Sequence, residues 1–456
     1  MADLVAIILA AGKGTRMKSK LPKVLHKVGG KPMVEHVMEA AEEAGVSRKI
    51  VVVGFGSEKV MEFIGGRAKV VLQAEQLGTG HAVLQAEPAL QGKKGTALIL
   101  CGDTPLLVGE ELEKFCQAHK ASGAAVSVLT AKTATPFGYG RIVRDKDGNV
   151  EKIVEEKDAT EAEKTITEIN TGIYCLEYPL AFQLLHSLST NNAQGEYYLT
   201  DILTKCREQG EKVAGILTED FSMVMGINSR KQLAEAEGIM RERILDKLMG
   251  EGVSIMDPAS TFIEASVKIG RDTVIYPFTW LEGKTVIGED CEIGPNVRLQ
   301  NVEIGDGNHI QFTYGHECKV ENNVTMGPYI HLRPNTLIHD KVKIGNFVEV
   351  KNSTVGVGTK LPHLTYIGDS DIGGGVNMGC GCITVNYNGK KKYRTIIEDD
   401  AFVGCNSNLV APVKVGKGSY VAAGSTITKD VPENSLGVGR GRQVNIDGWA
   451  EKYRQK

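Results

Sequence analysis

The chain has 456 residues, a length that suggests two or three domains of about 150 residues each. Hydrophobic residues make up 42% of the chain and charged residues 24%, so a large core can be buried and a largely disordered protein is excluded. The formal net charge is only −3, which leaves no excess of basic residues and argues against a nucleic-acid-binding protein.

No stretch approaches the ~18 consecutive apolar residues that a membrane-spanning helix requires. The early apolar run at 4–11 follows an aspartate instead of a basic segment, so we interpret it as a strand and not as a secretion signal. Nine cysteines are scattered without metal-ligand spacing. We therefore expect reduced thiols, a cytoplasmic location and no stable insertion into a membrane.

Residues 1–228 alternate short apolar runs with amphipathic ones and are expected to form the first domain. Near-continuous apolar strands between helices indicate an α/β, Rossmann-like fold with a mainly parallel sheet covered on both faces. The pattern predicts buried strands at 6–9, 50–53, 70–72, 97–100 and 126–129, and helices at 32–44 and 109–120.

Residues 229–250 change in character. Leu233, Met240, Ile244 and Leu248 lie roughly on one helical face, with charged residues around them. This pattern predicts a single helix that links the first domain to a second one, which spans residues 251–456.

From about residue 265 the hydrophobic pattern has a period of six. This period fits neither a helix nor a single alternating strand, and it is typical of a hexapeptide solenoid, a parallel β-helix with three short faces per coil. The aliphatic residue of each hexapeptide is expected to point inward. Three unbroken runs carry the pattern: Ile269, Ile275, Leu281, Ile287, Ile293 and Leu299; Val320, Met326, Leu332, Ile338, Ile344 and Val350; and Val403, Leu409, Val415, Val421 and Ile427.

A glycine-rich loop follows the first predicted strand. Gly12 and Gly14 would let backbone N–H groups approach an anion, and Arg16 and Lys23 add positive charge. The segment is neither a Walker loop nor the dinucleotide fingerprint, and a Gly-x-Gly pair alone would equally fit a simple turn.

Two further segments, QAEQLGTG at 73–80 and LCGDTP at 100–105, make the pattern specific. Together the three segments resemble the signature of sugar-1-phosphate nucleotidyltransferases. In that reaction one anion attacks another, so the site must neutralise charge, and Mg²⁺ is the usual means. Asp103 follows a predicted parallel strand and is well placed to bind the metal, although an N-cap of a helix is an alternative.

The solenoid carries its own polar residues. Acyl transfer to an amine needs a base with a pKa near neutrality, and His363 could supply it. Arg333 and Lys351 follow inward positions and could hold a sugar phosphate, and the basic run 390–392 could hold coenzyme phosphates. Taken singly, each of these residues could instead be structural or solvated.

Taken together, these features resemble the bifunctional bacterial N-acetylglucosamine-1-phosphate uridyltransferase/glucosamine-1-phosphate acetyltransferase family, over essentially the whole chain. The resemblance implies a uridyltransferase (pyrophosphorylase) domain followed by a left-handed parallel β-helix with acetyltransferase activity and a C-terminal tail. It also implies a homotrimer, with acetyltransferase sites where chains meet.

The resemblance also implies the site residues. UTP and UDP-N-acetylglucosamine would bind at Leu9, Ala10, Ala11, Gly12, Lys23, Gln73, Gln76, Gly78, Thr79, Gly140, Glu155, Asn170, Tyr198 and Asn228. Arg16 and Lys23 would act in uridyl transfer, and Asp103 and Asn228 would bind Mg²⁺. His363 would accept the proton during acetyl transfer. Glucosamine-1-phosphate would bind at Arg333, Lys351, Tyr366 and Asn377, and acetyl-coenzyme A at Asn386, Tyr387, Lys392, Cys405, Ala423 and Arg440.

The expected function is therefore acetylation of glucosamine-1-phosphate, followed by uridyl transfer from UTP to N-acetylglucosamine-1-phosphate with release of pyrophosphate. Two alternatives are a single-activity pyrophosphorylase with an oligomerising β-helix and a non-catalytic scaffold. An acetyl-enzyme on Cys405 is conceivable, but direct attack by the substrate amine is simpler.

Overall fold

The computed structural model describes residues 3–454. The chain forms two compact units, Met1–Met240 and Arg241–Lys456, and each is described separately. The boundary between them lies inside one long helix, α9 (Arg230–Gly250). None of the helices within residues 3–454 is long and apolar enough to cross a lipid bilayer.

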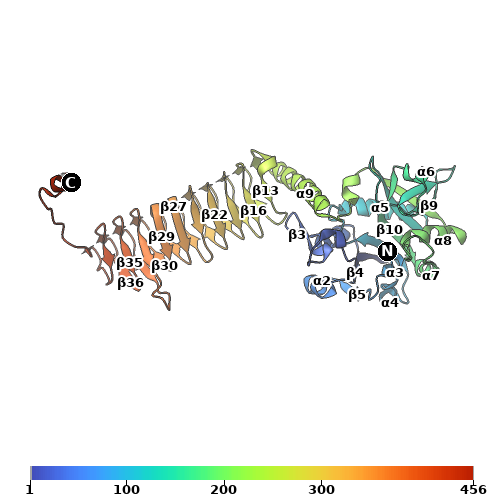
Figure 1. Cartoon of the computed structure of the whole chain (residues 1–456), viewed down its shortest axis with the longest axis horizontal. Helices are drawn as coiled ribbons and strands as arrows, with labels where there is room; N and C mark the ends of the chain where they lie inside the picture. Colours follow the sequence, from blue (N-terminus) through green and yellow to red (C-terminus); the bar gives the residue numbers. More distant parts are fainter. Residues whose placement is uncertain (1–2, 455–456) are drawn as a thin grey trace. The chain divides into compact units, whose positions relative to one another are not determined.

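The first unit is built on a nine-stranded sheet, which confirms the expected α/β fold (Figure 1). Its main path runs in the order β11-β7-β10-β6-β1-β4-β5, and only β10 is antiparallel to its neighbours on that path. The strands are β1 (Asp3–Ala10), β4 (Arg48–Val53), β5 (Lys69–Leu72), β6 (Gly95–Cys101), β7 (Val126–Lys132), β8 (Arg141–Arg144), β9 (Val150–Val154), β10 (Glu168–Tyr178) and β11 (Val213–Thr218).

Helices cover both faces of this sheet. Alternate residues of β1 enter two different cores: Ile7 packs with α3, α7 and α8, whereas Ile8 packs with α1, α2 and α5. This alternation follows from the two-residue period of a strand. The helices are α1 (Met33–Glu43), α2 (Ser57–Ile64), α3 (Thr79–Leu84), α4 (Glu87–Leu90), α5 (Gly109–Ser122), α6 (Glu161–Lys164), α7 (Leu180–His186) and α8 (Ile202–Glu208).

One predicted strand differs from expectation. The sequence predicts a buried strand at 70–72, but β5 is the edge strand of the sheet, and Leu72 is 56% exposed. An apolar run shows that a strand forms but does not show whether a second neighbour covers it.

The second unit is a parallel solenoid, as its six-residue period predicts, and has the left-handed β-helix architecture (Figure 1). Each coil contributes strands to two sheets. Two of the three faces form a continuous 19-stranded sheet, and the third face is a nine-stranded sheet. The third face consists of β14 (Lys268–Ile269), β17 (Val286–Ile287), β20 (Glu303–Ile304), β23 (Lys319–Val320), β26 (Leu337–Ile338), β28 (Thr354–Val355), β30 (Ser370–Ile372), β33 (Thr395–Ile397) and β36 (Val413–Val415).

Two strands of the large sheet, β27 (Lys343–Lys351) and β29 (Lys360–Gly368), run around a corner and join two faces. Its other strands are β12 (Ser254–Ile255), β13 (Phe262–Ile263), β15 (Val274–Ile275), β16 (Trp280–Glu282), β18 (Glu292–Ile293), β19 (Arg298–Gln300), β21 (His309–Ile310), β22 (Thr313–His316), β24 (Thr325–Met326), β25 (Ile330–Leu332), β31 (Asn377–Met378), β32 (Ile383–Val385), β34 (Phe402–Val403), β35 (Asn408–Val410), β37 (Tyr420–Val421), β38 (Thr426–Ile427) and β39 (Leu436–Gly437).

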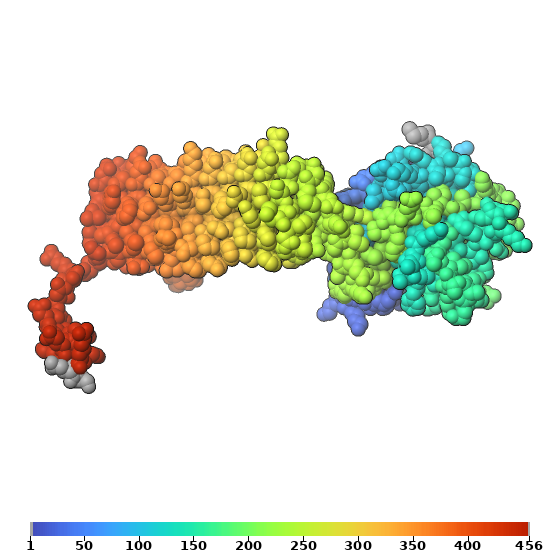
Figure 2. Space-filling view, turned by 90° about the horizontal axis from the view of Figure 1, so that it is seen from above, coloured from blue at the N-terminus to red at the C-terminus, as the bar shows by residue number. Residues whose placement is uncertain are grey.

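The inward positions predicted from the period are confirmed. All seventeen aliphatic residues of the three runs belong to or pack against one core cluster, and only Ile269, in the first coil, is partly buried. The tail behaves differently, because residues 441–454 are exposed and extend from the last coil without packing on it (Figure 2).

Candidate active sites

The first unit has a cavity of about 450 Å³ at the carboxyl edge of its sheet. The glycine-rich loop after β1 forms one wall, and the segments after β5 and β6 form the others. This is the edge where open α/β sheets bind ligands. Ten of the residues expected to bind the nucleotide or metal line the cavity: Leu9, Ala10, Ala11, Gly12, Lys23, Gln73, Gln76, Gly78, Thr79 and Asp103.

Local backbone geometry explains two of these positions. Gly78 has φ = 113°, and a Cβ atom there would lie 2.6 Å from the carbonyl oxygen of Tyr197. Only glycine fits such a position. Gln73 is 3% exposed, and its side-chain amide donates to the Gly78 carbonyl at 3.1 Å, so it holds the loop that carries Thr79.

Lys23 lies between the two residues expected to bind a metal. Its ammonium group forms an ion pair with Asp103 and donates to Oδ1 of Asn228 at 3.0 Å. A backbone bond from Ile227 to the Asp103 carbonyl, 2.9 Å long, ties the loop of Asn228 to the end of β6. Residues 125 positions apart in the chain therefore meet at one point beside the cavity.

The positions of Asp103 and Asn228 are compatible with a bound magnesium ion. The oxygens of Asp103 and Asn228 already converge on one cationic group, which shows that they can face a shared positive charge. A carboxylate and an amide oxygen are ligands that Mg²⁺ accepts, with water and substrate phosphates completing its shell. No cluster of three or more His, Cys, Asp or Glu side chains suited to a metal occurs within residues 3–454, so substrate would have to supply further ligands.

A second group of expected residues meets beside the cavity. Asn170 donates its backbone N–H to the Gly140 carbonyl at 2.9 Å. A Cβ atom on Gly140 would lie 3.4 Å from Cβ of Asn170 and 3.5 Å from Oε1 of Glu155. Thr200 donates to the same Glu155 oxygen at 3.4 Å. The side chains of Glu155, Asn170 and Thr200 form a small polar wall. Cys101 lines the cavity and contacts the carbonyl of Gly172, two residues after Asn170, so it connects this wall to the cavity.

The electrostatics of this wall are unusual. Burial raises the pKa of Glu155, and the nearby carboxylates of Asp158, Asp201 and Glu196 raise it further. Burial also raises the pKa of Asp201. Tyr198 is buried and donates to Asp158 at 3.3 Å, so its hydroxyl group is already engaged. A ligand that brings hydrogen-bond donors would stabilise the charged form of acidic groups held this close together.

Arg16 stands apart from these residues. It lies in the short helix η1 (Thr15–Met17), is exposed and does not line the cavity. Its role remains a prediction.

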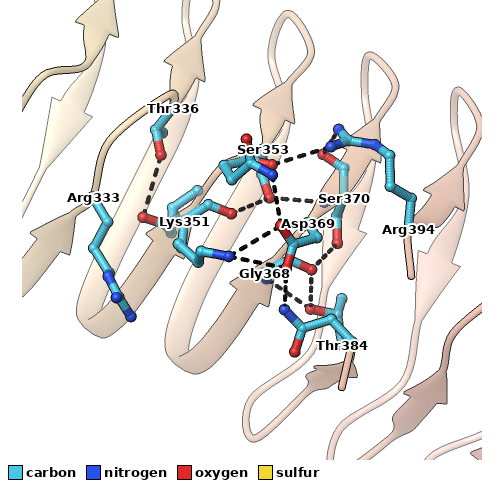
Figure 3. A network of polar contacts seen from close by, with 12 residues as sticks. Arg333, Thr336, Lys351, Ser353, Gly368, Asp369, Ser370, Thr384 and Arg394 are labelled. Atoms are coloured by element: carbon cyan, nitrogen blue, oxygen red, sulfur yellow. Dashed lines mark hydrogen bonds and ion pairs between the residues drawn. The ribbon is translucent and has the colours of Figure 1, made fainter. Parts of the chain in front are cut away.

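In the solenoid, a buried carboxylate organises the basic residues. Asp369 is 5% exposed and accepts hydrogen bonds from Lys351 at 3.1 Å, from Asn352 at 2.6 Å and from Asn386 (Figure 3). Burial alone would raise the pKa of Asp369, but the hydrogen bonds from Asn352, Lys351 and Asn386 outweigh it and lower the pKa. The carboxylate therefore stays charged and anchors the Lys351 ammonium group.

Two further cations, Lys392 and Arg333, lie in the vicinity of Lys351. Lys392 is close enough to Lys351 for the ammonium group of Lys351 to lower the pKa of Lys392, and Arg333 lowers it further. Arg333 also pairs with Glu349 at 3.0 Å. Such a cluster of positive charge is suited to a phosphate group. Lys392, expected at the coenzyme site, thus lies with the residues expected to hold the sugar phosphate.

His363 lies at a corner of the solenoid and is exposed. Its Nδ1 atom is 2.7 Å from Oδ1 of Asn346, which is its partner in the parallel register of β27 and β29. An amide oxygen can only accept, so Nδ1 of His363 donates and Nε2 keeps a free lone pair. This tautomer can take a proton from a substrate.

The expected coenzyme residues continue along the same corner. Backbone N–H groups donate hydrogen bonds to carbonyl oxygens of the preceding coil: Gly381 to Leu364 at 2.9 Å, Asn406 to Cys380 at 2.7 Å and Gly424 to Cys405 at 2.8 Å. His363, Cys380, Cys405 and Ala423 therefore occupy equivalent corner positions on successive coils. Arg440 donates to the Ala423 carbonyl at 2.8 Å and extends the row. We name this row the corner track.

Other expected residues lie elsewhere. Asn377 pairs with Lys360 on the face before the corner, whereas Tyr366 lies on the face after it. Tyr387 is 55% exposed and its hydroxyl donates to Gly389 at 2.6 Å, within its own loop. Asn377 and Tyr366 thus lie on two different faces of the solenoid, on either side of the corner that carries His363.

Sequence reasoning missed Asn346 and Asp369. Asn346 precedes His363 by one coil, and Asp369 follows Lys351 by one coil. Stepping one coil back from His363 and one coil forward from Lys351 would have found both partners, because parallel coils place such residues side by side.

Comparison with known proteins follows the same division of the chain. Residues 5–235 match the nucleotidyl transferase family, and residues 394–429 match the bacterial transferase hexapeptide (six repeats) family. The bifunctional protein GlmU of Geobacillus sp. (strain WCH70) is 55% identical over 452 residues, which cover 99% of this chain and 98% of that protein. The bifunctional protein GlmU of Geobacillus thermodenitrificans (strain NG80-2) is 54% identical over 456 residues, which cover 100% of this chain and 99% of that protein. The bifunctional protein GlmU of Listeria monocytogenes serovar 1/2a (strain EGD-e) is 52% identical over 451 residues, which cover 99% of both chains.

Proposed function

Because the chain belongs to the family of bifunctional GlmU proteins, we propose that it catalyses two consecutive steps of UDP-N-acetylglucosamine synthesis. The second unit acetylates glucosamine-1-phosphate, and the first unit transfers UMP from UTP to the acetylated sugar phosphate. The observation that carries the proposal is the presence of two separate sets of polar residues in one chain, one beside the cavity and one at the corner of the solenoid.

In uridyl transfer, a phosphate oxygen of N-acetylglucosamine-1-phosphate attacks the α-phosphorus of UTP, and the bond to pyrophosphate breaks. Lys23 supplies positive charge at the point where the phosphates meet, and backbone N–H groups of the loop at Gly12 bind phosphate oxygens. Asp103 and Asn228 would hold Mg²⁺, which when bound neutralises phosphate charge. Glu155 and Asn170 would bind the sugar.

In acetyl transfer, the amine of glucosamine-1-phosphate attacks the thioester carbonyl of acetyl-coenzyme A. Nε2 of His363 takes a proton from the amine as the C–N bond forms, the C–S bond breaks, and the protonated imidazole returns that proton to the departing sulfur, so that the coenzyme leaves as its thiol. The corner track gives the pantetheine arm a straight path that begins at His363 and ends at Arg440, with Cys405 and Ala423 between them. Direct attack needs no acyl group on Cys405.

The phosphate of glucosamine-1-phosphate would bind at Arg333, Lys351 and Lys392. Lys392 therefore serves the sugar phosphate in this proposal, and Arg440 is left for the coenzyme. Asn386 donates a hydrogen bond to Asp369, the carboxylate that anchors Lys351, and so stabilises the phosphate site without contacting the phosphate.

The second unit is also proposed to assemble as a trimer. Asn377 and Tyr366 lie on different faces that meet at the corner of His363, and a neighbouring chain packed against this corner would close the site around a shared substrate. Because the proposed substrates UTP and acetyl-coenzyme A are cytoplasmic metabolites, we propose the cytoplasm as the location.

The product of a coupled reaction tests the proposed function. The full-length chain is incubated with glucosamine-1-phosphate, acetyl-coenzyme A, UTP and MgCl₂, and mass spectrometry should detect UDP-N-acetylglucosamine. Free thiol should appear in equal amount. Uridyl transfer from supplied N-acetylglucosamine-1-phosphate without thiol release would favour the single-activity alternative.

Two variants should separate the activities. His363→Ala should lower acetyl transfer by about 10²–10⁴-fold, the usual contribution of a general base, and leave uridyl transfer within about twofold. Asp103→Ala should lower uridyl transfer and leave acetyl transfer unchanged. His309→Ala serves as a control, because that histidine lies on the same solenoid and pairs with Glu292. Equal loss of both activities in folded His363→Ala would contradict the assignment.

A further inference from the structure

A buried tyrosine lies behind the proposed sugar-binding wall. Tyr174 is 1% exposed in β10, and its hydroxyl donates to Oδ1 of Asn170 at 2.9 Å. The backbone N–H of Gly172 donates to the same oxygen at 3.0 Å.

These two bonds fix the orientation of the Asn170 amide. A backbone N–H can only donate, so the atom that faces Gly172 is the amide oxygen, and the tyrosine hydroxyl occupies its second lone pair. The amide nitrogen must then point away from the strand. No hydrogen bond from that nitrogen is present within residues 3–454.

Asn170 needs this support because the strand is irregular here. The register between β10 and β7 shifts between Asn170 and Tyr174, and Gly172 has φ = 79°. A bulge of this kind interrupts the ladder and turns a side chain in a new direction. Gly172 has no partner in the ladder at this bulge, so its N–H donates to Oδ1 of Asn170 together with the Tyr174 hydroxyl.

The gap at Gly140 is bordered by one apolar and two polar residues, since a Cβ atom there would lie 3.1 Å from Cγ2 of Ile153, 3.4 Å from Cβ of Asn170 and 3.5 Å from Oε1 of Glu155. The missing side chain of Gly140 leaves space beside Asn170, and Oε1 of Glu155 borders the same space. Asn170, whose amide nitrogen is a donor, and Glu155, an acidic acceptor, thus border one gap. A sugar that offers an acceptor oxygen to Asn170 and a donor to Glu155 would satisfy both.

We propose that Tyr174 is a positioning residue for uridyl transfer, which holds the Asn170 amide so that its nitrogen donates to an acceptor oxygen on the sugar of the sugar phosphate. The inference rests on the proposed function, since it assigns a role within that same site. Tyr174 does not contact substrate, and its effect passes through Asn170.

Steady-state kinetics of uridyl transfer test the proposal. Tyr174→Phe should raise KM for N-acetylglucosamine-1-phosphate about tenfold, the effect of losing roughly 1.4 kcal/mol of binding, and leave KM for UTP within about twofold. Asn170→Ala should raise the same KM, and adding Tyr174→Phe to it should have no further effect. A Tyr174→Phe effect that persists in the Asn170→Ala background, or that raises both KM values equally, would overturn the inference.

Two more variants guard against a simple folding defect. Tyr178→Phe removes another buried hydroxyl from the same strand, next to Gly95 at the other end of the sheet, and should leave both KM values unchanged. Asn170→Asp keeps the oxygen that Tyr174 and Gly172 bind but replaces the donor with an acceptor, so it should raise KM for the sugar phosphate at least as much as Tyr174→Phe. Full activity of Asn170→Asp would also overturn the inference, whereas a wild-type chain without uridyl transfer would defeat the proposed function itself.

Discussion

The carboxylates of Asp369, which is buried, and of Glu155, which is half-buried, have pKa values shifted in opposite directions. Hydrogen bonds from Asn352, Lys351 and Asn386 outweigh the effect of burial at Asp369 and lower its pKa. Glu155 accepts one long hydrogen bond from Thr200, and burial raises its pKa. The charged Asp369 therefore stabilises the folded chain. The charged Glu155 destabilises it until a ligand supplies further hydrogen bonds.

Removing the charge of Glu155 should therefore stabilise the first unit and impair its function. A carboxyl group whose pKa is raised by folding contributes stability that is present at low pH and is lost as pH rises through the pKa of the folded state. Glu155→Gln should raise the melting temperature of the first unit by about 2 °C near pH 8, with a smaller gain near pH 5. It should also raise KM for the sugar phosphate. Calorimetry at the two pH values checks this, and a gain that grows toward acid pH would contradict it.

Single residues were predictable where a local motif surrounds them. Gly12, Lys23 and Asp103 belong to short segments whose residue types already suit phosphate chemistry, and all three line the cavity. The partners that complete the sites come from other coils or strands, as Asn346 does for His363. A one-dimensional motif does not contain such a pairing; it arises only when the register is known.

At the level of elements, period was the most informative property of the sequence. The six-residue repeat located the inward residues of the solenoid, because each coil must bury one aliphatic side chain per face. In the first unit, apolar runs located β1, β4, β5, β6 and β7, but they gave neither the edge position of β5 nor the strands β8 to β11, among them the antiparallel β10. Strand order and direction depend on connections that hydrophobicity does not record.

The inward positions should dominate the stability of the second unit. Ile338→Ala removes a side chain that is 0% exposed in β26, and a cavity of this kind should lower the free energy of unfolding by about 2–5 kcal/mol. Ile396→Ala, at a 43% exposed position in β33 on the same face, should cost less than about 1 kcal/mol. Denaturant unfolding of the two variants measures the difference. Similar losses would show that the repeat does not define the core.

At the level of the whole molecule, one corner of the solenoid carries a row of aromatic rings, half-buried or exposed, before the corner track begins. Phe312, Tyr329 and Phe347 occupy this ridge, with ring centroids 5.4 and 5.1 Å apart between neighbours. Tyr329 and Phe347 are 56% and 54% exposed in the single chain. The ridge lies next to the proposed acetyltransferase residues, so a second copy of the chain that covers it could also complete their pocket.

A charge on the ridge should break the proposed assembly. Phe347→Glu should convert the trimer to a monomer, because a carboxylate cannot be buried unpaired in an apolar interface. Acetyl transfer should fall at least about tenfold, while uridyl transfer stays within about twofold. Light scattering after gel filtration measures the mass. Val286→Glu, on the third face, should change neither mass nor activity, and an unaltered mass of Phe347→Glu would count against the ridge as the interface.

The corner track limits which insertions and deletions the solenoid can tolerate. Its members follow one another by backbone bonds between adjacent coils, so their alignment depends on each intervening segment completing a full circuit. Loss or gain of a whole circuit ahead of Phe312 would shift the track along the axis and preserve every neighbour relation within it. Loss of a few residues inside a circuit would instead rotate everything downstream to a different face, and would part His363 from Cys405 without touching either.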